Sequence, residues 1–212
     1  MEKNIIQIQT ALFFKSAFHG DFEEVSLKIK EKIPDINNVS LLPIPKEVPD
    51  ELPRLTLQYE KFNINVSKNR LDIFFGDYFS MKENILTVKE VLEDLKIEVG
   101  RIGFVKNLFC TGGLSDVKSI IAENQRKNLD GLKDVSIRVN IEKKICGFNC
   151  NDVQDIKIGK ANFPSGEKRD GLVVVRDVNT LQEESQVNTF DAESIGRVLD
   201  SFNIETELMI LL

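Results

Sequence analysis

A short stretch at residues 109–116, FCTGGLSD, places a thiol, two adjacent glycines and a helix-start serine close together. Glycines before a helix let backbone N–H groups approach a phosphate, which makes the stretch a candidate ligand-binding loop. The Gly-Lys-Ser/Thr sequence that closes a P-loop is absent, however, and Asp116 in the first helical turn opposes an anion. We therefore expect a hinge between a strand and a helix that begins at Ser115, with ligand binding as the alternative. The residues of that alternative site are Thr111, Gly112, Gly113, Ser115, Arg126 and Lys127.

The chain has three cysteines and one histidine, which limits the chemistry that its thiols could perform. Cys110 would need a base to act as a nucleophile, and His19 is the one histidine that could serve. A structural zinc site needs four ligands, so it would use His19 and all three thiols, including Cys146 and Cys150. We expect a buried, inert Cys110, a hairpin turn that carries the other two thiols, and no metal or cofactor.

Signatures of serine hydrolases, kinases, dinucleotide-binding enzymes and HExxH metalloproteases are absent from the chain. With one histidine and no tryptophan, few residues are available for acid–base chemistry. The sequence therefore favours a protein without enzymatic activity, and it offers no residue that we would assign as catalytic.

Charge is unevenly distributed along the chain, whose net charge is −6. Residues 126–169 carry 10 Lys/Arg against 6 Asp/Glu, whereas residues 170–212 carry 2 against 9. A protein that reads nucleic acid usually shows a stronger basic footprint. Nucleic-acid binding is therefore not expected, and the charge segregation points to a protein–protein surface. The first residues do not resemble a signal peptide and no apolar run is long enough to span a membrane, so we expect a cytoplasmic protein.

The apolar pattern alternates between strand-like and helix-like periods, which predicts the α+β class with mainly antiparallel sheets. Predicted strands lie at about 4–15, 36–42, 54–60, 61–67, 70–76, 98–109, 135–144, 152–163 and 171–179. Helices are predicted at about 21–33, 81–96, 115–127 and from about 191. The stretches CGFNCN (146–151) and PSGEKRDG (164–171) separate the last strands. We divide the chain into an N-terminal α+β subdomain, residues 1–130, and a C-terminal meander-plus-helix subdomain, residues 131–212.

Several prolines in the loop that follows residue 42 predict a stiff, exposed connection. The loop is either a rigid crossover or a docking segment for a partner. We take a protein partner as the expectation, and assign its binding to the loop and to the acidic C-terminal region through Pro43, Pro45, Pro49, Glu183 and Glu184. The apolar end of the chain, ELMILL, further predicts a homo-oligomer.

Arg101 lies in an otherwise apolar predicted strand, VGRIGF. A charged side chain in such a strand must either face solvent or find an opposite charge. We expect a structural ion pair at this position.

Three stretches, PRLTLQYEKFNINVSKNRLDIFF (53–75), GRIGFVKNLF (100–109) and the strand–linker–helix region 171–202, resemble a sporadically distributed family of uncharacterised bacterial and phage proteins. The resemblance implies a fold of two meander-and-helix halves and a mobile-element or defence context, with no catalytic residues. We therefore expect a non-enzymatic protein-interaction protein that inhibits or regulates a bacterial defence or toxin component. The alternative is a small-ligand or nucleotide-binding protein that uses the 110–116 loop and the basic stretch 126–144.

Overall fold

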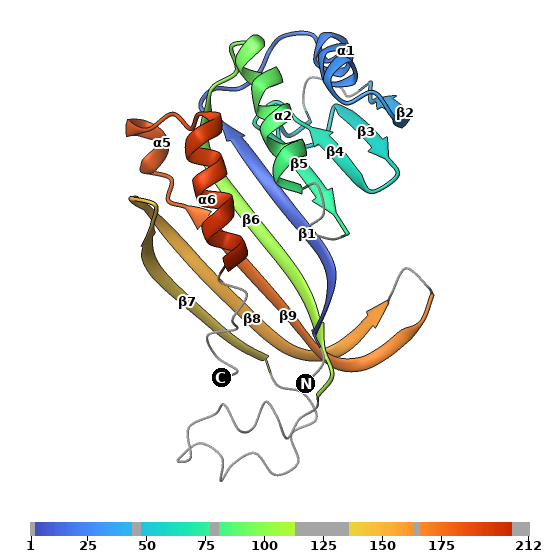
Figure 1. Ribbon diagram of the computed structural model, residues 1–212, viewed down its shortest axis with the longest axis vertical. Helices are drawn as coiled ribbons and strands as arrows, with labels where there is room; N and C mark the ends of the chain where they lie inside the picture. Colours follow the sequence, from blue (N-terminus) through green and yellow to red (C-terminus); the bar gives the residue numbers. More distant parts are fainter. Residues whose placement is uncertain (1–2, 44–47, 77–80, 113–135, 163–165, 205–212) are drawn as a thin grey trace.

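The computed structural model describes residues 3–43, 48–76, 81–112, 136–162 and 166–204 (Figure 1). Within these ranges one antiparallel sheet and four helices are present, which confirms the predicted α+β class. The elements in chain order are β1 (Lys3–Phe14), α1 (Phe22–Lys32), β2 (Ile36–Leu41), β3 (Leu55–Tyr59), β4 (Phe62–Val66), β5 (Arg70–Phe75), α2 (Met81–Asp94), β6 (Val99–Cys110), β7 (Ser136–Ile145), β8 (Phe148–Asn162), β9 (Lys168–Thr180), α5 (Glu184–Val187) and α6 (Ala192–Ile204).

The nine described strands form one sheet in the order β2-β3-β4-β5-β1-β6-β9-β8-β7. Every pairing is antiparallel, and the two longest-range neighbours, β1 and β6, lie at its centre. Across them Leu12 faces Ile102 and Ile8 faces Lys106. Residues that face each other in an antiparallel pair project to the same side, so this register assigns each side chain to one face of the sheet.

The two halves of the sheet follow the same path. β1 is followed by a meander whose last strand, β5, returns to pair with it, and α2 comes next. β6 is likewise followed by a meander whose last strand, β9, returns to pair with it. The short helix α5 and then α6 follow β9, and α6 is the last described element. The α2 and α6 helices contact each other, and Lys82 Nζ on α2 lies 2.7 Å from Asp200 on α6. The two meander-and-helix halves predicted from the sequence thus share a strand order in which the last strand of each meander pairs with the first strand of its half.

The predicted boundary between residues 130 and 131 lies outside the described residues. Strands from the two sides of that boundary pair directly, since β6 and β9 run together from Gly103–Asn179 to Cys110–Leu172. The division into two subdomains stays a prediction.

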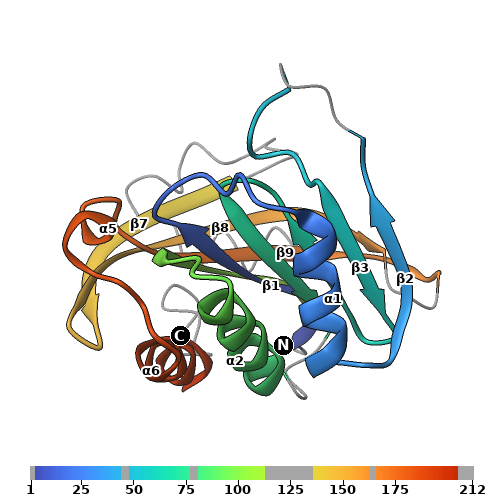
Figure 2. The ribbon, with the colours of Figure 1, turned by 90° about the horizontal axis from the view of Figure 1, so that it is seen from above.

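Helices α1, α2 and α6 lie on one side of the sheet (Figure 2). Each turns an apolar stripe to the same core, as the 3.6-residue period of the sequence indicates. The buried residues of these stripes include Val25, Ile29, Ile85, Val88, Leu92, Ile195, Val198 and Leu199. They pack on sheet residues such as Ile73 and Phe104. None of the helices in the described ranges is long and apolar enough to cross a membrane.

Two predicted helix starts are confirmed by their caps. The Asp21 side chain accepts a hydrogen bond from the backbone N–H of Glu23 at 2.8 Å, just before α1. Asp191 accepts from the backbone N–H of Ser194 at 2.8 Å, just before α6. An acidic cap satisfies N–H groups that lack helical partners and complements the helix dipole. The helix predicted at 115–127 lies outside the described residues.

The predicted loop CGFNCN is wrong in length, because only Cys146 and Gly147 form the turn between β7 and β8. Both residues have positive φ angles, 51° and 92°, as a two-residue hairpin turn with the twist of its strands requires. Pairing therefore resumes at once with Ile145 opposite Phe148. The loop PSGEKRDG is shorter than predicted as well, since β9 begins at Lys168.

Gly171 sits where the β6 and β9 backbones leave no room for a side chain. A Cβ atom there would lie 2.5 Å from the Phe109 ring and 2.7 Å from the carbonyl oxygen of Cys110. We expect Gly171→Ala to lower the free energy of unfolding by about 1–3 kcal/mol through overpacking. Chemical denaturation measures the change. The matched control is Gly159→Ala on the paired position of β8, where the nearest atom lies 3.4 Å away; an equal loss in both variants would contradict the prediction.

Candidate functional site

A groove of about 570 Å³ opens between the start of α1 and the loop that follows β2. Asp21 and Phe22 form one wall, and Leu41, Leu42 and Pro43 form the other. Arg54 at the start of β3 and Lys68 in the turn between β4 and β5 also line it. The groove thus combines an apolar wall with charges of both signs, in a volume that is ordinary for binding sites.

The loop beside the groove is fastened to the sheet. Lys68 Nζ lies 2.8 Å from Asp50 Oδ1, and the Lys68 backbone N–H donates to the Asp50 carbonyl at 3.1 Å. The hydrogen bond from Lys68 lowers the pKa of the Asp50 carboxyl below its usual value. Leu42 donates its backbone N–H to the carbonyl of Arg54 at 2.8 Å, and an Arg54 guanidinium N–H donates to the Val48 carbonyl at 3.4 Å. The described ends of the loop are therefore held in place, as a preformed site requires.

Exposed leucines surround this groove. Leu41, Leu42 and Leu52 are 42%, 46% and 45% exposed. Leu41, the last residue of β2, and Leu42 line the groove, whereas Leu52 lies in the loop before β3. In the described part of the sheet β2 pairs only with β3 and is therefore an edge strand. An edge strand presents backbone N–H and C=O groups that an extended peptide can pair with. Apolar side chains, a groove and a sheet edge thus meet in one place.

The predicted partner-binding residues separate in space. Pro43 is exposed and lines the groove, Pro49 is exposed in the same loop but does not line it, and Pro45 lies outside the described residues. Glu183 is exposed beside α5. Glu184 is buried, and its carboxylate accepts from the backbone N–H and the side-chain amide of Asn149, both at 2.8 Å. Glu184 therefore ties α5 to the start of β8, and the acidic residues do not join the groove.

The predicted ligand-binding loop is only partly described. Thr111 is exposed and Gly112 half-buried, directly after the end of β6. Gly113, Ser115, Arg126 and Lys127 lie outside the described residues. The end of a strand at Cys110 agrees with the strand side of the predicted hinge, and the ligand-binding alternative stays a prediction.

The thiols and the histidine are far apart. Cys110 is buried at the end of β6, as predicted, whereas His19 is exposed beyond the opposite end of that strand, where Phe14 faces Val99. Because a strand advances about 3.4 Å per residue, more than about 30 Å separates the two, which excludes a Cys110–His19 pair. Burial raises the pKa of the Cys150 thiol to about 11, so this thiol is protonated and unreactive near neutral pH. Cys146 is exposed in the hairpin turn and lies 3.1 Å from the Ser201 hydroxyl.

Arg101 is held by a hydrogen bond and by an aromatic ring. Its Nε–H donates to the Thr180 carbonyl at 3.1 Å, and its guanidinium carbon lies 4.7 Å from the centre of the Phe13 ring. Burial lowers the pKa of Arg101, and the carboxylates of Asp177 and Glu183 oppose that shift. Asp177 and Glu183 therefore act on Arg101 through their charge, and the described residues hold it by a hydrogen bond and an aromatic ring in place of the predicted ion pair.

A buried ionic cluster crosses the helix-covered face of the second half of the sheet. The guanidinium of Arg176 on β9 donates two hydrogen bonds, of 3.0 and 2.7 Å, to the carboxylate of Asp152 on β8. Lys143 Nζ on β7 lies 2.9 Å from the same carboxylate. Lys106 on β6 faces Arg176 across the strands and is buried too. This cluster joins four neighbouring strands without opening a cavity to solvent among the described residues, and we assign it a structural role.

Together these features define a single-sheet α+β protein with a preformed groove at its sheet edge and no assembled catalytic group among the described residues. No protein-family model matches the chain, and no curated protein matches it. The exposed leucines of the groove escaped the sequence analysis, although the adjacent pair Leu41-Leu42 directly before the prolines is a signal of an exposed apolar docking segment.

Proposed function

We propose that this protein is a non-enzymatic interaction protein that binds an extended, apolar segment of a protein partner along β2 and in the groove beside it. The observation that carries the proposal is the pair of exposed leucines, Leu41 at 42% and Leu42 at 46%, that lines a groove of about 570 Å³ at a sheet edge. A bound strand would pair with the outer edge of β2, and its apolar side chains would contact Leu41 and Leu42.

The chemistry of the groove supports a peptide better than a small polar ligand. Its apolar wall of Phe22, Leu41, Leu42 and Pro43 offers area for hydrophobic burial, which drives most protein association. Asp21 is already engaged as the cap of α1, and Lys68 is engaged with Asp50.

A role as an inhibitor or regulator of a bacterial defence or toxin component is part of this proposal and derives from the family resemblance. Self-association through the apolar C-terminus belongs to the same proposal.

Selection of peptides from a displayed random library tests the groove. We expect enriched peptides with alternating apolar residues, and we expect Leu42→Asp to weaken their binding by about tenfold, or 1.4 kcal/mol. Fluorescence anisotropy with the synthesised peptides measures the change. The control is Leu27→Asp, which alters a leucine that is 62% exposed on α1 outside the groove. Failure to enrich any peptide, or equal weakening by both substitutions, would contradict the proposal.

A further inference from the structure

The face of the sheet opposite α1, α2 and α6 carries none of the described helices, and in that sense we call it the uncovered face; it has an unusual composition. The register aligns two rows of side chains that cross all nine described strands on this face. The first row is Asn38, Gln58, Asn63, Phe74, Gln9, Val105, Asp177, Val153 and Asn140. The second is Ser40, Thr56, Asn65, Asp72, Ala11, Gly103, Asn179, Asn151 and Glu142. Side-chain amides make up five of the nine residues in the first row and three of the nine in the second, and an amide can donate to and accept from the edge of a nucleobase.

A third row places two arginines on one aromatic ring. Phe13 on β1 faces Arg70 on β5 and Arg101 on β6, and the two guanidinium carbons lie 5.8 and 4.7 Å from the centre of the half-buried ring. Cation–π contact fixes the orientation of both side chains. β1 alone separates their strands, so the arginines stand about 10 Å apart.

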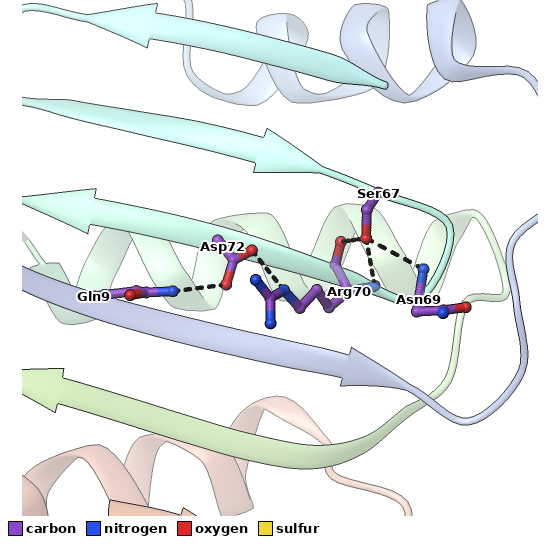
Figure 3. A network of polar contacts seen from close by, with 5 residues as sticks. All are labelled: Gln9, Ser67, Asn69, Arg70 and Asp72. Carbon is purple, nitrogen blue, oxygen red and sulfur yellow. Dashed lines mark hydrogen bonds and ion pairs between the residues drawn. The ribbon is translucent and has the colours of Figure 1, made fainter. Parts of the chain in front are cut away.

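Among the described residues, the Nε–H is the one side-chain group through which each of these arginines donates a hydrogen bond. Arg70 Nε donates to Asp72 Oδ2 at 2.8 Å, and Gln9 donates to the other oxygen of that carboxylate at 2.9 Å (Figure 3). The Ser67 hydroxyl accepts from the backbone N–H groups of Arg70 and Asn69, which fixes the start of β5 (Figure 3). Arg101 Nε donates to the Thr180 carbonyl. In the part of the chain that the structure describes, the terminal nitrogens of both arginines make no hydrogen bond, so their forks are available to an acceptor such as a phosphate.

A small pocket lies at the edge of this face, about 13 Å further along β1, where Glu60 and the core residues Tyr59, Phe62 and Phe75 also line it. It has a volume of about 180 Å³, and Phe74, Gln7 and Asn63 are among its lining residues. Phe74 is half-buried and stands between Gln9 and Asn63 in the first row. An aromatic ring beside two amides is the arrangement on which single-stranded nucleic-acid binders stack and read a base.

The two faces of the sheet differ in charge. Helices α1, α2 and α6 carry nine carboxylates against six cations, whereas the strand positions of the uncovered face carry six cations against four carboxylates. Of those four, Asp72 is paired with Arg70, and Asp155 accepts from the Ser136 hydroxyl at 3.0 Å. Burial raises the pKa of Asp177, against a hydrogen bond from Asn179 that lowers it. The net charge of −6 therefore conceals a face with a cationic excess.

We propose that the uncovered face binds single-stranded nucleic acid, with Arg70 and Arg101 on the phosphates and Phe74 against a base. This role is independent of the peptide groove at β2. It also reverses the expectation drawn from the overall composition, because only the folded chain gathers the cations and amides on one face. Few cations contact the backbone, so the affinity should be modest and should fall with salt at a log–log slope of about −1 to −2.

Fluorescence anisotropy with labelled single-stranded DNA, single-stranded RNA and duplex DNA of about 12 nucleotides, in about 50 mM salt, tests the proposal. We expect the single strands to bind better than the duplex. The double variant Arg70→Gln/Arg101→Gln should weaken binding by about tenfold or more, and Phe74→Ala by about tenfold. Arg197→Gln removes the same charge from exposed Arg197 on α6, across the molecule, and should change binding less than about twofold.

Thermal unfolding establishes that each variant is folded before its affinity is compared. Ultraviolet cross-linking of the wild-type protein gives a second reading that needs no variant, and the cross-linked peptide is expected to include Phe74. Tighter or equal binding of the duplex, no binding of any oligonucleotide, equal loss in Arg197→Gln, or cross-links confined to the helices would each overturn the proposal. A complete absence of binding would leave this face to a protein partner.

Discussion

Asp152→Ala is expected to lower the free energy of unfolding by about 3–5 kcal/mol, because it removes the one carboxylate of a buried ionic cluster. Asp152 is 0% exposed, and Arg176 and Lys143 both contact it within 3.0 Å. Removing it leaves the buried Arg176 and the half-buried Lys143 without this counter-charge. Urea denaturation at neutral pH measures the loss.

The control for this variant is Asp155→Ala on the same strand. Asp155 points to the uncovered face, is half-buried, and makes one hydrogen bond with Ser136. Its loss should cost no more than about 1 kcal/mol. A double variant, Asp152→Leu/Arg176→Met, should be more stable than Asp152→Ala, since no unpaired partner remains between these two positions. If Asp152→Ala is as mild as Asp155→Ala, the cluster does not hold the second half of the sheet together.

The contribution of Asp152 should also depend on pH. Burial opposes ionisation of this carboxyl, but hydrogen bonds from Arg176 and Lys143 outweigh burial and lower its pKa below the usual value. A depressed pKa in the folded state gives stability that is present above the unfolded-state pKa of about 4 and is lost as the pH falls through the folded-state value. The stability difference between wild type and Asp152→Ala should therefore shrink as the pH is lowered below about 4. A constant difference down to acid unfolding would contradict the assignment.

Lys106 is expected to make the protein more stable as the pH rises from about 8 toward about 10, by up to about 3 kcal/mol. The residue is 3% exposed, and burial, together with the nearby charge of Arg176, lowers its pKa from 10.5 to about 8. Between these two values the unfolded chain holds a proton that the folded protein has lost. Stability rises with pH wherever the unfolded state binds more protons.

Lys106→Met should remove this rise, so that the stability difference between the wild type and the variant changes by up to about 3 kcal/mol over the same range; the raised pKa of the Cys150 thiol lowers the stability of both proteins alike. Urea denaturation at a series of pH values up to about 9.5 measures both profiles. The range stops there because burial raises the pKa of Tyr59 to about 12. Above about pH 10 the unfolded chain loses this phenolic proton while the folded protein keeps it, so the free energy of unfolding falls. Identical slopes for the wild type and Lys106→Met would show that Lys106 is protonated in the folded protein throughout.

The local signals in the chain predicted its elements well, because short-range physics controls them. Alternating apolar residues identified the strands from β1 to β6, and caps such as Asp21 and Asp191 marked the starts of α1 and α6. The turn between β7 and β8 was predicted too long, because a two-residue turn depends on backbone angles at Cys146 and Gly147 that composition does not reveal. The short helix α5 was missed inside a polar linker, since Glu184 stabilises it through Asn149, which is distant in the sequence.

The candidate sites were harder to predict. Pro43 was recognised as part of a docking loop, but the groove beside it needs α1, β3 and the Lys68 turn to come together. Likewise Arg101 was singled out as a charge in an apolar strand, and yet its neighbours Phe13 and Thr180 come from strands that only the sheet brings together.

By itself the sequence determined the class of the protein, the order and period of most elements, and the burial of Cys110, because hydrophobic periodicity and capping act over a few residues. Only the tertiary structure decided which strands became neighbours, and with them the Asp152 cluster, the groove at β2 and the amide-rich uncovered face. Strand order is a matter of long-range pairing, and a side chain's face and partners follow from that pairing rather than from its place in the chain.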